Sequence, residues 1–152
     1  MTAHAFLPTR NPAGSSVLAT SAAVINLPAV YPICHEASAY ISSKLAAVRL
    51  LEHVAQECPD VFTLSVHPGI IPTDLMAEGG MTVDNMEGSI IDNPQLAANF
   101  MVWATSPEAA FLRGKWVYAN WDVEQLKQRA QEIQQSGILT PNILGWPFEA
   151  KP

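Results

Sequence analysis

The segment between residues 37 and 67 constrains the fold most, because it predicts a long helix followed at once by a buried strand. Pro59 ends the helix, since proline cannot continue one and disfavours helical geometry in the residue before it. Residues 61–66 form an apolar, β-branched run between turn-forming pairs, which is typical of a strand. A helix followed directly by a strand favours an α/β fold with parallel strands.

The predicted helix over residues 37–58 is apolar on most of its surface. Arg49, Glu52, His53 and Gln56 follow the spacing i, i+3, i+4, i+7 and so make a single polar stripe. The remaining surface is formed mainly by Leu45, Ala46, Val48, Leu50, Leu51, Val54 and Ala55. A helix with so broad an apolar surface is expected to be covered on more than one side.

The composition indicates one globular domain and excludes several functional classes. The chain has 152 residues, of which 49% are hydrophobic and 14% charged, so it can build a core. A net charge of −6 without a basic run argues against nucleic acid as a partner. Cys34 and Cys58 match no metal spacing, and we expect free thiols in a reducing, cytoplasmic environment. We expect no signal peptide and no membrane span.

Tyr40 and Lys44 form the pair that carries chemistry. Their spacing of four places both side chains on one helix face, one turn apart. A free tyrosine is a poor acid or base at neutral pH, but a nearby ammonium group favours the phenolate. The pair is therefore suited to a tyrosine that exchanges protons with a substrate oxygen. Such pairs also occur by chance on surface helices, so the neighbouring residues must decide.

Those neighbours resemble the short-chain dehydrogenase/reductase family, fungal type. The similarity runs through Ser38 to Ala46, His67 to Asp74, Ser106 to Lys115 and Ala119 to Val123. It covers nearly the whole chain but only the C-terminal half of the family's domain, and the family's glycine-rich cofactor turn has no counterpart. The resemblance implies the C-terminal portion of a Rossmann-like, doubly wound parallel sheet. We expect about three strands with flanking helices over residues 1–121 and a C-terminal helix and tail over 122–152.

The resemblance assigns catalytic roles to three residues. Tyr40 would be the general acid/base, and Lys44 would tune it and bond the nicotinamide ribose. Ser21, at the end of a predicted strand over residues 16–21, would hydrogen-bond the substrate carbonyl. An alternative register ends that strand at residues 24–27 and leaves the site without its serine. Ser21 can also be read simply as a small strand-end residue.

The resemblance also implies residues that contact the cofactor and the substrate. The loop carrying Pro68, Gly69, Ile71 and Thr73 would meet the nicotinamide of NAD or NADP, at the strand end where open α/β sheets place ligands. The ordinary alternative for this loop is a plain turn. The substrate pocket would include Tyr31, Ile33 and His35. A loop histidine such as His35 is more often merely exposed to solvent.

The rest of the chain supplies the remaining elements. Residues 77–93 resemble the family's substrate-binding lid, 94–105 predict a helix, and 114–119 predict the last core strand. Asp122 is a suitable N-cap for a helix over 123–135, which Gly137 would end. Trp121 and Trp146 are expected to be packing residues.

Three functions remain open at this point. The first is an NAD(P)-dependent oxidoreductase for a small carbonyl or alcohol substrate, represented by its C-terminal portion and forming a homodimer through the 37–58 helix. The second is a cofactor-independent proton-transfer enzyme, such as an isomerase, cyclase or dehydratase of secondary metabolism. The third is a non-catalytic protein that binds a partner through an exposed sheet edge and the apolar helix face.

Overall fold

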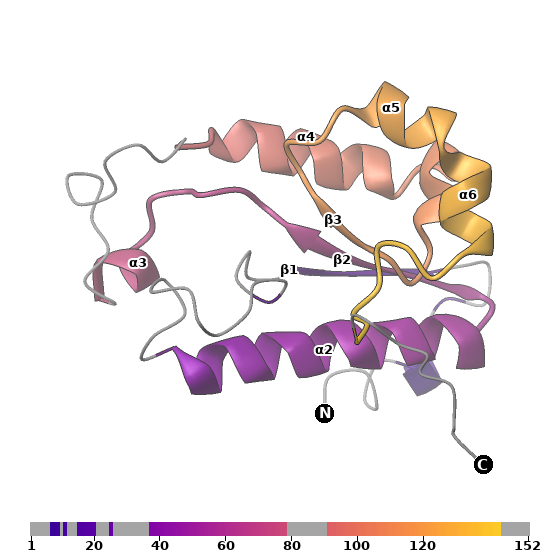
Figure 1. Cartoon of the computed structure of the whole chain (residues 1–152), viewed down its shortest axis with the longest axis horizontal. Helices are drawn as coiled ribbons and strands as arrows, with labels where there is room; N and C mark the ends of the chain where they lie inside the picture. Colours follow the sequence, from indigo (N-terminus) through magenta and orange to yellow (C-terminus); the bar gives the residue numbers. More distant parts are fainter. Residues whose placement is uncertain are drawn as a thin grey trace, which may run out of the picture.

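The computed structural model describes residues 7–9, 11, 15–20, 25, 37–78 and 91–143. Its elements follow the order expected for a strand–helix–strand unit with a helical C-terminal part (Figure 1). They are η1 (Leu7–Thr9), β1 (Ser15–Thr20), α2 (Ser38–Glu57), β2 (Val61–His67), α3 (Asp74–Glu78), α4 (Pro94–Ala104), η5 (Pro107–Leu112), β3 (Trp116–Tyr118), α5 (Val123–Gln128) and α6 (Ala130–Gln135). Among the described residues, no helix combines the length and apolarity needed to cross a bilayer.

The sheet has three parallel strands in the order β1-β2-β3. Strand β2 lies in the middle, and its residue Leu64 is paired with Leu18 of β1. Further along β2, Val66 is paired with Val117 of β3. This arrangement confirms the predicted α/β class and the predicted number of strands.

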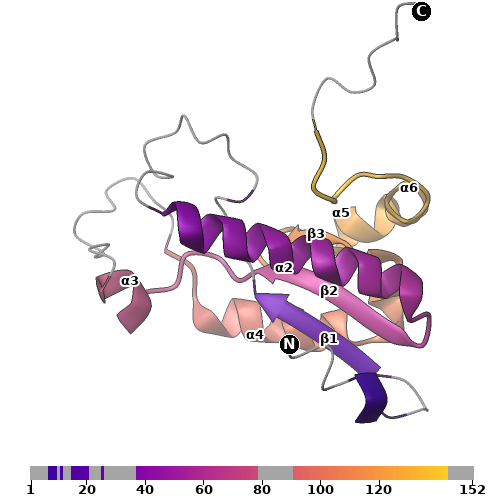
Figure 2. The ribbon, with the colours of Figure 1, turned by 90° about the horizontal axis from the view of Figure 1, so that it is seen from below.

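Helix α2 covers one face of the sheet. The turn at residues 58–60 reverses the chain, so α2 and β2 run in opposite directions (Figure 2). Val48, Leu51 and Val54 are buried on the side of the helix that faces the sheet. The buried hydroxyl of Thr63 donates a hydrogen bond of 2.9 Å to the carbonyl of Leu51, so the polar atom of this central strand is satisfied.

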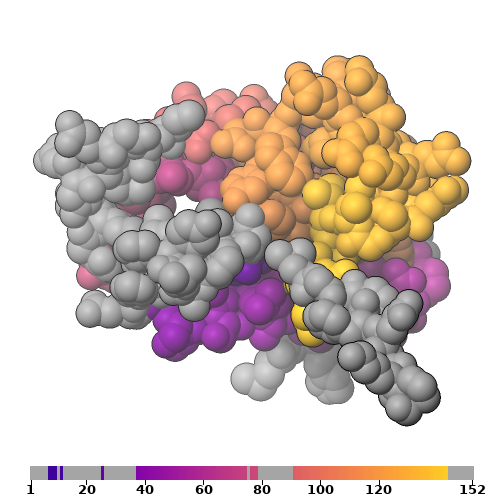
Figure 3. All heavy atoms as spheres, in the orientation of Figure 1, coloured from indigo at the N-terminus to yellow at the C-terminus, as the bar shows by residue number. Residues whose placement is uncertain are grey.

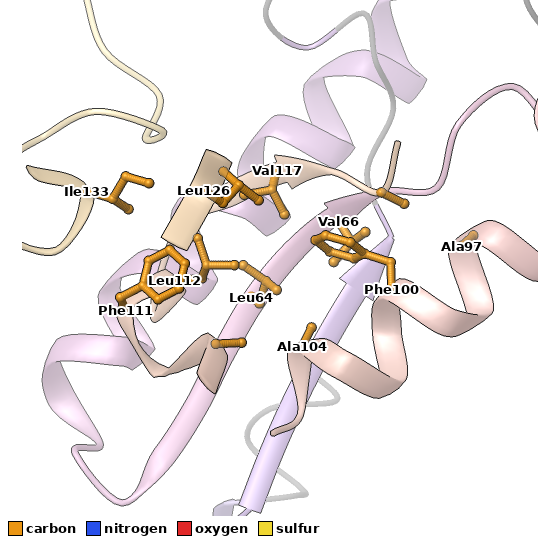
Figure 4. Close-up of a cluster of buried hydrophobic side chains, with 12 residues drawn as sticks. Leu64, Val66, Ala97, Phe100, Ala104, Phe111, Leu112, Val117, Leu126 and Ile133 are labelled. Carbon is orange, nitrogen blue, oxygen red and sulfur yellow. The ribbon is translucent and has the colours of Figure 1, made fainter. Parts of the chain in front are cut away.

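The opposite face of the sheet carries the larger core, drawn in Figure 4. Side chains alternate between faces along a strand, so Leu64 and Val66 point away from the Thr63 side. They belong to one buried cluster with residues from five other elements. The labelled partners are Ala97, Phe100, Ala104, Phe111, Leu112, Val117, Leu126 and Ile133. With helices on both faces, the sheet is doubly wound, as expected.

The turn before β3 makes hydrogen bonds to the C-terminal end of α2. The guanidinium of Arg113 donates to the carbonyl of Ala55 at 2.7 and 3.1 Å and to that of Cys58 at 2.6 Å. These carbonyls lie at the C-terminus of α2, where no helical donors remain. Gly114 follows at φ +73, and a Cβ there would lie 2.9 Å from the Cβ of Ala55. Glycine is therefore required for both backbone conformation and space.

Lys115 makes hydrogen bonds to the segment that follows α6. Its buried ammonium group donates to the carbonyls of Ser136 at 2.7 Å and Ile138 at 3.2 Å. Burial lowers the pKa of Lys115, and the charge of Glu52 opposes this effect. Beyond this point the segment reaches α2, and Figure 3 shows its yellow atoms against the purple atoms of that helix. Arg49 of α2 donates to the carbonyl of Pro141.

Several local predictions need correction. The helix predicted over 123–135 is divided at Arg129, whose N–H bonds the carbonyl of Leu126 three residues back, a tighter turn than the α-helical one. The division keeps both Leu126 and Ile133 buried in the core. Asp122 caps α5 as predicted, accepting from the N–H of Gln125 at 3.0 Å. The short helices α3 and η5 were not predicted.

Candidate active site

Tyr40 and Lys44 lie on one face of α2, in its first two turns. The Nζ of Lys44 is 5.6 Å from the centre of the Tyr40 ring, a cation–π distance. The Tyr40 side chain is 44% exposed, so its hydroxyl can be reached from solvent. The hydroxyl of Ser43 bonds the Tyr40 carbonyl at 2.7 Å and holds this turn of the helix.

The predicted nicotinamide loop follows β2 directly. Pro68, Gly69 and Ile71 are half-buried, whereas Thr73 is exposed. Thr73 immediately precedes α3, and its hydroxyl accepts a hydrogen bond of 3.3 Å from the N–H of Met76 in the first turn of that helix. Within the described part of the chain, no hydrogen bond uses the amide or the carbonyl of Ile71.

His67 ends β2 and shapes the start of this loop. Its Nδ1 accepts a hydrogen bond of 3.0 Å from the N–H of Gly69. Its ring packs against Tyr118, with ring centres 4.8 Å apart. Burial lowers the pKa of His67, and the negative charge of Asp92 opposes this effect. The neutral imidazole is thus the form that accepts the Gly69 bond.

Asp92 lies against the same loop, although it is more than twenty residues away in the sequence. Its Oδ2 accepts from the N–H of Ile70 at 2.8 Å, and its own N–H donates to the Ile70 carbonyl at 2.8 Å. Its Oδ1 is 3.5 Å from the Nδ2 of Asn120, which follows β3. Sequence reasoning missed Asp92 because no local pattern links it to a loop so distant in the chain.

The two groups of predicted site residues lie at the same end of the molecule. Because α2 and β2 run in opposite directions, the helix begins where the strand ends, as Figures 1 and 2 show. The Tyr40 and Lys44 side chains form no hydrogen bond with the 67–73 loop among the described residues. Ser21, Tyr31, Ile33 and His35 fall outside the described residues, so their assigned roles stay predictions.

A cavity of about 300 Å³ lies elsewhere, between α5, α6 and the segment after α6. It is lined by Trp121, Asp122, Gln125, Leu126, Arg129, Ile133, Ile138 and Leu139. None of these is a predicted site residue. Trp121 also packs against the core, as predicted. In the described ranges, no three His, Cys, Asp or Glu side chains are grouped to hold a metal ion.

Comparison with known proteins gives the site its context. No protein family matches in a scan of the chain against family profiles. The short chain dehydrogenase mpl6 of Monascus purpureus is 35% identical over 110 residues, which cover 71% of this chain. The short chain dehydrogenase/reductase nsrO of Aspergillus novofumigatus is 37% identical over 112 residues, or 69% of this chain. The chain is homologous to part of the fungal short-chain dehydrogenases/reductases. A Claviceps purpurea member is 36% identical over 105 residues, or 66% of this chain.

The matched regions are only a part of each relative. They span 37% of the Monascus protein, 34% of the Claviceps protein and 37% of the Aspergillus protein. The chain thus corresponds to little more than a third of these short-chain dehydrogenases. This agrees with the partial resemblance carried by Tyr40, Lys44 and the Pro68–Gly69 loop.

Proposed function

We propose that this chain carries the proton-transfer pair and the nicotinamide-contacting loop of an NAD(P)-dependent short-chain dehydrogenase/reductase. The observation that carries the proposal is the pairing of Tyr40 and Lys44, 5.6 Å apart from ring centre to Nζ, on the first turns of α2. This helix end lies at the same end of the molecule as the 67–73 loop. The fungal relatives named short-chain dehydrogenases support the same reaction class. The substrate class would be a small carbonyl compound or alcohol.

The residues present fit a bound nicotinamide at two points. The N–H and carbonyl of Ile71, which have no hydrogen-bond partner in the described part of the chain, match the donor and acceptor of a carboxamide. The exposed Thr73 lies two residues further along the loop. Lys44 presents an ammonium group that could bond a ribose hydroxyl. When bound, the nicotinamide would supply or accept the hydride.

The protein's own part in the reaction is proton transfer and orientation. In the reducing direction, the Tyr40 hydroxyl would donate its proton to the substrate oxygen. The positive charge of Lys44 would stabilise the negative charge that develops on the tyrosine oxygen. The Ile71 backbone would hold the carboxamide and so fix which face of the ring meets the substrate. Ser21 would orient the substrate carbonyl.

A titration tests the proposal. The purified chain is titrated by calorimetry with NADPH and then with NADH, beside Tyr40→Phe and Lys44→Ala. We expect saturable binding of one dinucleotide, weaker binding in Lys44→Ala and unchanged binding in Tyr40→Phe. In a screen of carbonyl substrates, Tyr40→Phe should lose roughly 100-fold or more in rate, as expected for a general acid. Absence of binding at millimolar dinucleotide would overturn the proposal for this chain.

We also propose a homodimer through α2. Leu50 is 49% exposed and Leu45 is 38% exposed, on a helix whose buried residues already face the sheet. These two large apolar side chains are left exposed on either side of the buried face of the helix, which supports a partner that covers α2. A second copy of the same helix would supply a matching apolar surface.

A further inference from the structure

The contact between Asp92 and the loop after β2 uses both the side chain and the backbone of Asp92. Ile70 receives one bond at its N–H from Oδ2 and one at its carbonyl from the Asp92 N–H, each 2.8 Å long. Both polar backbone groups of Ile70 are therefore satisfied by a single residue. The first bond holds the Gly69–Ile70 peptide and the second holds the Ile70–Ile71 peptide, so Asp92 contacts the peptide on each side of the Ile70 Cα.

The loop is built to admit the Asp92 carboxylate. Gly69 adopts φ +94, and a Cβ at this position would lie 2.4 Å from Oδ2 of Asp92. No side chain could occupy that space while the carboxylate stayed in place. Gly69 and Asp92 are thus a matched pair, and the absence of a side chain at one residue allows the close approach of the other.

The contact with Asp92 also constrains Ile71, because the peptide bond is planar. The carbonyl of Ile70 and the N–H of Ile71 belong to one rigid plane and point in opposite directions. The backbone N–H of Asp92 holds the Ile70 carbonyl and so determines the direction of the Ile71 N–H. The carboxylate bond to the Ile70 N–H keeps Asp92 in place for this contact. That N–H has no hydrogen-bond partner among the described residues.

We propose that Asp92 is a positioning residue, which orients the Ile70–Ile71 peptide so that the Ile71 N–H is presented to the carboxamide of a nicotinamide. The inference rests on the proposed function for the identity of the ligand. It adds a residue outside the predicted site that fixes the geometry of that ligand's backbone contact. Asn120, 3.5 Å from Oδ1, supports the carboxylate from the side of β3.

The test uses two substitutions of Asp92 and one matched control. Asp92→Ala removes the carboxylate that anchors residue 92 to the Ile70 N–H and leaves its backbone N–H without that anchor, whereas Asp92→Asn keeps an oxygen that can accept from Ile70. Asp122→Ala also removes an aspartate that accepts a backbone hydrogen bond, but at the N-terminus of α5 and not in this loop. NADPH and NADH affinities are measured by calorimetry, and amide hydrogen exchange at Ile70 and Ile71 is followed by NMR.

We expect Asp92→Ala to weaken dinucleotide binding about tenfold and to speed exchange at the Ile70 amide by a similar factor, since a charge-assisted bond is lost. Asp92→Asn should restore affinity to within about threefold of the original chain. Asp122→Ala should leave affinity unchanged even where it lowers stability. Wild-type affinity in Asp92→Ala would overturn the inference.

The two proposals fail in different ways. If the unsubstituted chain binds neither dinucleotide, the proposed function fails for this chain, and amide exchange alone decides the role of Asp92. In that case, faster amide exchange at Ile70 and shifted Ile71 resonances in Asp92→Ala would support the role of Asp92 in orienting the peptide. Both changes should be absent in Asp92→Asn. Unchanged exchange and unchanged resonances in Asp92→Ala would exclude it.

Discussion

The Nδ1 atom of His67 accepts a hydrogen bond of 3.0 Å from the backbone N–H of Gly69, two residues further along the chain. The bond closes the turn that leads from β2 into the proposed nicotinamide loop. It requires Nδ1 without a proton, because a protonated imidazole carries donors at both nitrogens. The turn is therefore coupled to the protonation state of one buried histidine.

That coupling predicts a loss of stability in mild acid. Burial holds the pKa of His67 below its ordinary value of 6.5, so the unfolded chain takes up this proton first as the pH falls. The free energy of unfolding should therefore fall as the pH drops below about 6.5. The fall caused by His67 should end once the pH is below the pKa of His67 in the folded chain. Urea unfolding at pH 7.5, 6.5 and 5.5 measures this decline.

The matched variants for this measurement are His67→Asn and His53→Asn. Asparagine at position 67 can accept from Gly69 through its side-chain oxygen but does not titrate, so the decline should be smaller. His53 is exposed on α2, so its replacement is the control for removing a histidine outside this turn. An equal pH dependence in the original chain and in His67→Asn would contradict the prediction.

Gly69→Ala should destabilise the chain by about 1–3 kcal/mol, because φ +94 is unfavourable for alanine and its Cβ would collide with the Asp92 carboxylate. Gly137→Ala is the control, since no heavy atom lies within 4 Å of the Cβ it would add. Urea unfolding should place the control within about 0.5 kcal/mol of the original chain. Similar losses at both glycines would argue against a specific role of the Asp92 contact.

Arg113→Ala should lower the free energy of unfolding by about 1–3 kcal/mol, because the carbonyls of Ala55 and Cys58 lose a charged donor. Arg129→Ala provides the comparison. Arg129 pairs with Glu132 at the exposed surface, 2.8 Å from nitrogen to oxygen, and its removal should have little effect. Thermal unfolding of both variants measures the difference, and a neutral Arg113→Ala would show that the helix end is held by packing alone.

Leu50→Glu should shift the chain from dimer to monomer, because it buries a charge in the proposed α2 interface. Val102→Glu introduces the same charge on α4, where the side chain is 72% exposed, and should leave the oligomeric state unchanged. Sedimentation velocity distinguishes the two states. A monomeric unsubstituted chain would disprove the α2 dimer.

The sequence by itself determined the order of the main elements and the residues that begin or end them. Pro59 ends the α2 region, Asp122 caps α5, and the β-branched run before His67 forms the central strand. These are local effects of proline geometry, capping and side-chain periodicity, so neighbouring residues suffice to predict them. The Tyr40–Lys44 pairing is local for the same reason, since a helix places residues four apart on one face.

Only the tertiary structure decided how the loop after β2 is held. Asp92 reaches Ile70 because the parallel strands bring the ends of β2 and β3 and the start of α4 together. The division of the last helix at Arg129 is likewise a tertiary outcome, in which Leu126 and Ile133 both remain in the core. Contacts across twenty or more residues depend on the packing of whole elements, and a single sequence carries no local periodicity that reports them.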